Sequence, residues 1–149
     1  LGEHFVPRLL AGRRPRLLQG DLDAPHSFTH VDDVARTLVT LGADERAWGR
    51  PWHVPTDRAV PVREIATRLA RIAGVPDRGV QVLPQAAIRL GGLIVPFLRE
   101  LAEVRYQFAE PFVLDSGAAQ AVFGLVPTPL DEGLAQTVAW WRDQERAAV

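Results

Sequence analysis

The sequence changes character abruptly between Phe28 and Val39. Phe28 to Val31 is a short run of aromatic, β-branched and apolar residues around His30, which is typical of a β-strand. Asp32 and Asp33 follow directly, and an aspartate at a helix start accepts hydrogen bonds from the free N–H groups of the first turn. Apolar residues then recur at helical spacing: Val34, Ala35, Leu38, Val39 and Leu41. We therefore predict a strand, an aspartate cap and a helix over residues 33–43.

The rest of the chain alternates between helical and extended patterns. Helices are predicted over Glu3–Ala11, Pro61–Ala73, Gln85–Leu93, Phe97–Tyr106, from Asp115 and Ser116 (as caps) through Phe123, and over Asp131–Arg146. Short strands are predicted over Leu17–Gln19, Trp52–Val54, Val80–Leu83 and Phe112–Leu114. This order predicts an α/β fold, or α+β by strand count, as a single domain over residues 1–149. The strands are too few for a free-standing sheet, so the sheet should be incomplete.

Composition excludes several classes of function. The 149 residues carry a formal net charge of −1 and 47% hydrophobic residues, so no bulk charge favours nucleic acid or an anionic membrane. No apolar run approaches the ~20 residues of a membrane span. The chain has no cysteine, and its four histidines are scattered, so we expect neither disulfides nor a metal site. With no signal peptide at Leu1, we expect a cytoplasmic location.

The chain contains no lysine, because all 17 basic residues are arginine. This absence excludes Schiff-base chemistry, a P-loop lysine and a tyrosine–lysine proton relay from this polypeptide. A phosphate-binding loop would also need closely spaced glycines between a strand and a helix, and none is present. We therefore assign no catalytic or cofactor-binding residue and expect no NAD or NADP to bind this chain alone.

One cluster has the composition of a hydrolase triad: His26, Ser27, His30 and the pair Asp32/Asp33. On a strand, His30 and Asp32 would share one face, whereas Ser27 points away from His26. No nucleophile elbow surrounds Ser27. We therefore favour a structural interpretation in which an aspartate caps the helix and His30 packs beside the strand.

Arginines supply the candidate ligand contacts. Arg13, Arg14 and Arg16 on a turn could hold a diphosphate or carboxylate, and Arg105 beside Tyr106 could do the same. The alternative for both groups is a solvated surface. Four tryptophans could line a pocket or pack in the core: Trp48, Trp52, Trp140 and Trp141.

Three blocks resemble the C-terminal part of an extended short-chain dehydrogenase/reductase of the NAD-dependent epimerase/dehydratase family. The first is Phe28–Arg36, similar to that family's strand–Asp–helix signature. The second is Gly49–Thr56 followed by Val62–Ala66, and the third comprises Leu114–Ser116, Phe123–Leu134 and Val138–Trp141. In this order they span nearly the whole chain.

The resemblance implies a Rossmann enzyme whose N-terminal half binds NAD(P) and supplies a Tyr-x-x-x-Lys pair. The C-terminal half closes over a substrate that is commonly a nucleotide-sugar. This chain is similar only to that second half, and its single tyrosine, Tyr106, has no lysine partner. It departs from the nucleotide-sugar pattern at His26-Ser27, where that group has an arginine, and over Arg105–Phe112, so a less characterised reductase or epimerase-like branch fits as well.

We therefore predict the substrate-binding portion of an NAD(P)-dependent epimerase, dehydratase or reductase, inert alone, with a small-molecule substrate contacted by Arg13, His26 and Arg105. NAD or NADP would bind only the intact parent. The alternative is a non-catalytic binding or interaction module in which Ala86–Leu101 forms a protein interface. An incomplete sheet leaves uncovered edges and faces, so we also expect self-association.

Overall fold

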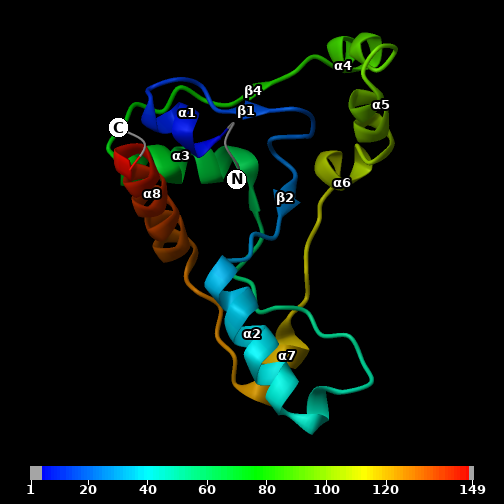
Figure 1. Ribbon diagram of the computed structural model, residues 1–149, viewed down its shortest axis with the longest axis vertical. Coiled ribbons are helices and arrows are strands. Elements are labelled where there is room, and N and C mark those ends of the chain that lie inside the picture. The colour runs from blue at the N-terminus through cyan, green and yellow to red at the C-terminus, as the bar shows by residue number, and fades with distance from the viewer. Residues whose placement is uncertain (1–4, 148–149) are drawn as a thin grey trace.

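The computed structural model describes residues 5–147, without the side chains at positions 85, 89, 98, 101 and 102. Its buried core joins three helices that gather at one end of the molecule (Figure 1). These are α1 (Val6–Leu10), α3 (Val62–Ala73) and α8 (Leu130–Ala147). The part of the predicted Glu3–Ala11 helix before residue 5 lies outside the described residues.

Helix α3 follows its sequence pattern. Ile65 and Leu69 are fully buried and Ile72 is partly buried, because residues four and seven apart share one face of a helix. The helix ends at Gly74, whose φ of 67° is left-handed and therefore suits glycine. The predicted Pro61–Ala73 helix is confirmed, one residue shorter.

Helix α8 packs its inner face on α3. The predicted Asp131–Arg146 helix is confirmed, one residue longer at each end. Leu134 and Val138 are buried, and Trp141 is partly buried against them. The first N–H group of the helix, at Leu130, donates to the Asp57 carboxylate at 2.9 Å. A carboxylate from a distant loop therefore caps this helix.

The strands are two residues long and form two separate pairs. Strand β1 (Arg16–Leu17) pairs in parallel with β4 (Gln81–Val82), and β2 (Pro25–His26) pairs antiparallel with β3 (Val60–Pro61). A single parallel bridge joins His26 to Phe112. The predicted mixture of helices and short strands with an incomplete sheet is confirmed.

Two predicted strands are wrong, and a third, Phe112–Leu114, is reduced to the isolated bridge at Phe112. The chain leaves β2 at His26, so Phe28–Val31 forms no strand, and α2 begins at Val31 and ends at Ala43. Trp52–Val54 also has no strand partner. Its position is fixed by side chains instead, because the Trp52 indole N–H donates to the Ala47 carbonyl at 2.8 Å and the ring packs edge-on against Phe123.

The remaining helices surround these pairs. They are a short 3₁₀ turn (Glu45–Ala47), α4 (Gln85–Gly91), α5 (Pro96–Glu103), α6 (Tyr106–Ala109) and α7 (Gly117–Phe123). Helices α4 and α5 lie apart from the α1–α3–α8 core, and α6 leads back from them (Figure 1). At the predicted Asp115/Ser116 cap, only the Asp115 carboxylate accepts a backbone N–H of the first turn, from Gly117 at 2.9 Å, whereas the Ser116 hydroxyl accepts from Thr56.

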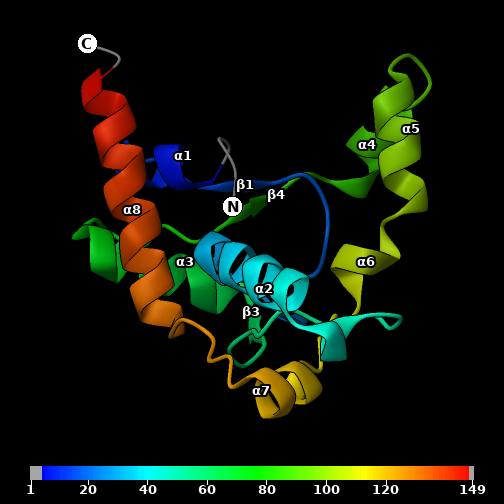
Figure 2. The same cartoon turned by 60° about the horizontal axis from the view of Figure 1, so that its bottom comes forward.

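Helix α2 presents its apolar side outward. In Figure 2 it runs across the front of the molecule, and no other ribbon covers it. Its buried side chains are polar, Asp33 and Thr37. The opposite, exposed face is apolar or small and consists of Val31, Ala35, Leu38, Val39 and Gly42.

Candidate functional site

A cleft of about 560 Å³ lies where the β1–β4 pair meets α4 and α6. The cleft floor is formed by Val82, Leu83 and Ile88, and Glu103, Arg105, Tyr106 and Glu110 also line the cleft. A second hollow of about 410 Å³ shares Gly20, Arg105 and Ala109 with it and adds Asp21, Asp23 and Arg63. We call the two hollows together the β1–α6 cleft.

Gly20, in the loop after β1, allows α6 to pack close to that loop. Its φ of 127° is a conformation that residues with side chains rarely adopt. A Cβ placed there would lie 2.7 Å from the Phe108 carbonyl oxygen, which also accepts the Asp21 N–H at 2.9 Å. The wall of the cleft therefore depends on a glycine at this position.

The side chain of His26, in β2, also contacts α6. Its Nδ1 lies 2.9 Å from the Ala24 carbonyl oxygen, and its Nε2 lies 3.0 Å from that of Gln107. A neutral imidazole donates only one of these hydrogen bonds. Because both ring nitrogens face backbone carbonyls, the ring positions α6.

The charges in the β1–α6 cleft are mostly negative. Arg63 binds the Asp23 carboxylate with two hydrogen bonds, of 2.7 and 2.9 Å. The hydrogen bonds from Arg63 hold the pKa of Asp23 below its usual value. That pair is therefore satisfied internally, and the other charged groups among the described lining residues are the carboxylates of Asp21, Glu103 and Glu110 and the guanidinium of Arg105. Asp21 Oδ1 also accepts the Asp23 N–H at 2.8 Å.

The structure separates the three predicted substrate contacts. Arg105 lines both hollows of the cleft. His26 is tied to α6 next to the cleft, and Arg13 lies on the turn after α1, where its N–H donates to Arg8 at 2.8 Å. Sequence reasoning missed Gly20, Glu103 and Glu110. The only local signal was Gly20-Asp21 in a loop, because the contact of Gly20 with Phe108 spans most of the chain.

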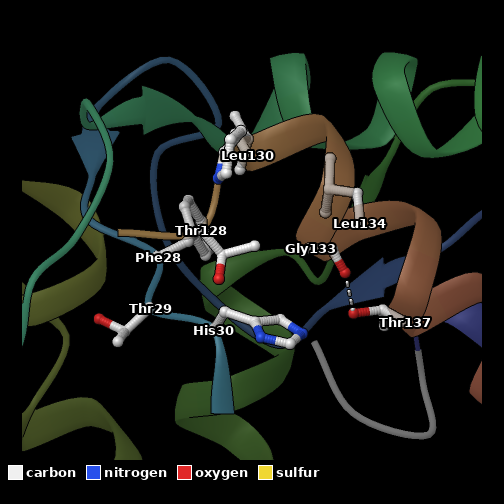
Figure 3. Close-up of a pocket in the computed structure, with 9 residues that line it drawn as sticks. Phe28, Thr29, His30, Thr128, Leu130, Gly133, Leu134 and Thr137 are labelled. Carbon is white, nitrogen blue, oxygen red and sulfur yellow. Dashed lines mark hydrogen bonds between the residues drawn. The ribbon is translucent and has the colours of Figure 1, made fainter. Parts of the chain in front are cut away.

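A smaller cavity of about 140 Å³ surrounds His30, between the start of α2 and α8 (Figure 3). The imidazole points toward Thr137, whose hydroxyl donates to the Gly133 carbonyl at 2.8 Å. Gly133 permits this close packing, since a Cβ there would lie 3.1 Å from the ring. His30 Nδ1 is buried without a hydrogen-bond partner among the described residues, and Asp32 lies 4.0 Å from it.

The predicted aspartate cap at the start of α2 is wrong, because Asp33 binds a distant segment instead. The N-cap residue of α2 is His30, whose side chain makes no capping hydrogen bond. The buried Asp33 carboxylate accepts hydrogen bonds from the Thr128 N–H at 2.8 Å and the Thr128 hydroxyl at 2.7 Å, and it also pairs with Arg36. These contacts join the start of α2 to the segment before α8. Ser27 accepts from the Leu114 N–H, and His30 packs against α8.

The tryptophans contact neighbouring aromatic and charged side chains. The Trp140 and Trp141 rings lie edge-to-face with centroids 4.8 Å apart, and Arg50 stacks 4.0 Å over Trp52. Trp140 also lines a shallow hollow of about 330 Å³ with His30. These contacts favour packing over a shared ligand pocket for Trp52, Trp140 and Trp141, whereas Trp48 is 64% exposed.

No protein-family model matches the sequence, and no curated protein matches it. Solved structures do match. A UDP-glucuronic acid 4-epimerase from Bacillus cereus in complex with NAD aligns over 89% of this chain with a TM-score of 0.61 and 16% identity. RMD from Pseudomonas aeruginosa complexed with NADPH aligns over 93% with a TM-score of 0.61 and 19% identity. A putative epimerase from Burkholderia cenocepacia aligns over 93% with a TM-score of 0.59 and 26% identity.

The alignments cover 35% of the Bacillus chain and 39% of each of the other two. This chain therefore spans less than half the length of the enzymes that it resembles. Within the described residues, no helix is long and apolar enough to cross a membrane. The resemblance to the extended short-chain dehydrogenase/reductases is confirmed at the level of the fold: this chain has the fold of part of an enzyme of that family.

Proposed function

We propose that this chain is the substrate-side portion of an NAD(P)-dependent epimerase, dehydratase or reductase. The observation that carries the proposal is the fold, shared over nearly the whole chain with part of enzymes that hold NAD or NADPH. In this proposal the β1–α6 cleft binds the substrate. Hydride transfer belongs to a nucleotide-binding part that this chain does not supply.

The chain's own residues do not fit a dinucleotide. Strand β1 runs into the Gly20-Asp21 loop and then to β2, with no helix between them. Strands β3 and β4 do lead into α3 and α4, but neither junction contains the closely spaced glycines that let a backbone approach a pyrophosphate. We therefore assign binding and orientation to this chain and no step of the redox chemistry.

The exposed face of α2 supports the proposal that a further part of the enzyme packs on this chain. A helix of a soluble domain normally buries its apolar stripe and exposes its polar side. Here Val31, Leu38 and Val39 are 70%, 65% and 74% exposed, whereas Asp33 is 3% exposed. This orientation suits a helix whose outer face contacts a further layer of protein.

The total surface supports the same conclusion. A folded monomer of 16.4 kDa is expected to expose about 7,500 Å², whereas this chain exposes 9368 Å². The excess of about 1,900 Å² exceeds the ~800 Å² that one partner buries in an interface of standard size. The nucleotide-binding part of the proposed enzyme would cover it.

The test is to express the complete reading frame that contains this chain and to measure NADH and NADPH binding by fluorescence. We expect binding by the complete product and none by residues 1–149. Leu38→Glu should weaken cofactor binding or yield of the complete protein by disturbing the α2 face, whereas Gln144→Glu, on the exposed side of α8, should not. A complete product that binds neither cofactor would overturn the proposal.

A second candidate is an interaction module without catalysis. The observation that favours it is a group of exposed large apolar side chains in the turn between α4 and α5 and on the adjoining helix ends: Leu90, Leu93, Ile94, Val95 and Phe97. A reading frame that starts beside Leu1, without a glycine-rich βα turn and a Tyr-x-x-x-Lys upstream, would favour this candidate.

A further inference from the structure

The floor and rim of the β1–α6 cleft differ in polarity. Val82, Leu83 and Ile88 supply an apolar floor, and Ile88 is 5% exposed, so this part of the cleft is well packed. The Tyr106 ring is 60% exposed and adds an aromatic surface at the rim. A ligand with an apolar body would remove this surface from water.

The charges at the rim favour a cation over an anion. After the Asp23–Arg63 pair is formed, the described lining residues leave three carboxylates, those of Asp21, Glu103 and Glu110, and the one guanidinium of Arg105. A diphosphate brings two or more negative charges and is usually held by several arginines or lysines in bidentate contacts. The Arg63 guanidinium directs two of its five N–H donors to Asp23, so its positive charge is already matched by that carboxylate.

We propose that this cleft takes a substrate with an apolar body and no phosphate group, and that it prefers an ammonium group to a carboxylate. The inference rests on the proposed function, in which this cleft is the substrate site. Glu103 and Glu110 are the groups that set the preference. An ammonium group at the rim would also contact the face of Tyr106.

The test uses four probes on the 149-residue chain: 3-phenylpropylamine, 3-phenylpropanol, 3-phenylpropionate and uridine diphosphate. The first three share a phenyl ring on a three-carbon chain and differ in the terminal group, which is an ammonium, a hydroxyl or a carboxylate. Dissociation constants are measured by NMR chemical-shift titration at low salt. We expect the amine to bind about tenfold or more tightly than the carboxylate, with the alcohol between them and uridine diphosphate weakest. The amine preference should shrink at about 0.5 M NaCl.

Matched variants assign the preference to this cleft. The double variant Glu103→Gln with Glu110→Gln should reduce the amine-to-carboxylate ratio to about threefold or less, because the rim then loses two carboxylates. Glu145→Gln removes one negative charge near the far end of α8 and should leave the ratio unchanged.

Tighter binding of the carboxylate or of uridine diphosphate, an unchanged ratio in the double variant, or no binding of any probe would overturn the inference. None of these measurements involves NAD(P). A failed cofactor assay on the complete protein would therefore contradict the proposed function without altering the order of the probes.

Discussion

Replacing Asp33 with alanine tests the joint between α2 and the segment that leads into α8. The carboxylate is 3% exposed and accepts two hydrogen bonds from Thr128, at 2.8 and 2.7 Å. Both bonds are charge-assisted, and such bonds stabilise a fold by about 1.5–3 kcal/mol each. Thr128 is only partly buried, so water replaces part of what is lost. We expect Asp33→Ala to lower the free energy of unfolding by about 3 kcal/mol.

The measurement is urea unfolding followed by circular dichroism, supported by a thermal melt in which the loss corresponds to about 10 °C. Thr128→Val keeps the backbone N–H but removes the hydroxyl, which donates to Asp33 and accepts from Arg36 at 3.2 Å, and it should cost about half as much. Asp32→Ala is the matched control, since this neighbouring carboxylate is 66% exposed and makes no close hydrogen bond to a described residue. It should change stability by less than about 0.5 kcal/mol. Equal effects at positions 32 and 33 would refute the reasoning.

Three further predictions concern the core, the ion pairs and the cleft. Leu69→Ala should cost about 2–5 kcal/mol in urea unfolding, because Leu69 is fully buried in the core. Arginine hydrogen bonds, chiefly from Arg68, lower the pKa of Glu64 and of Asp131. Their contribution is therefore present above the unfolded pKa values of 4.5 and 3.8, and the melting temperature should fall as pH drops below them. Gly20→Ala should displace α6, seen as a changed NMR signal of Tyr106, and cost about 1–3 kcal/mol.

Each of these has a control within the chain. Val39→Ala truncates a side chain that is 74% exposed and should be nearly neutral. Arg68→Gln should flatten the acid-side fall in melting temperature, and an unchanged profile would contradict the assignment. Gly79→Ala also introduces a side chain at positive φ but meets no atom within 4 Å. Gly79→Ala should therefore lower the free energy of unfolding through backbone strain alone and leave the NMR signal of Tyr106 unchanged.

The long helices were predictable because their own side chains determine them. Helix α3 combines a regular apolar spacing with a glycine at its end, and both signals are local. The residues Phe28–Val31 have strand-forming side chains, but a strand also needs a hydrogen-bonded neighbour. The structure places such neighbours beside Pro25 and His26 and none beside Phe28. Tertiary context therefore overrides the local propensity.

The candidate site was less predictable for a related reason. Arg105 could be chosen from the sequence because an arginine beside an aromatic residue is a recognisable ligand contact. Gly20 could not, because the atom that leaves no room for a side chain there is the carbonyl oxygen of Phe108, far along the chain. Asp33 was assigned to its own helix because capping is a local rule, whereas its partner, Thr128, lies on a distant segment.

The main hydrophobic cluster draws its buried side chains from Phe5, α1, β3, α3 and α8, whereas α4 contributes the single buried side chain of Ile88 among the described residues. This uneven distribution affects which regions open first. Regions with few buried apolar contacts open at a lower free energy than the molecule as a whole. Amide protons in α4, α5 and α6 should therefore exchange with solvent well before those in α3. The wall of the β1–α6 cleft can then move to admit or release a ligand while α3 and α8 remain folded, which separates access to the cleft from global unfolding.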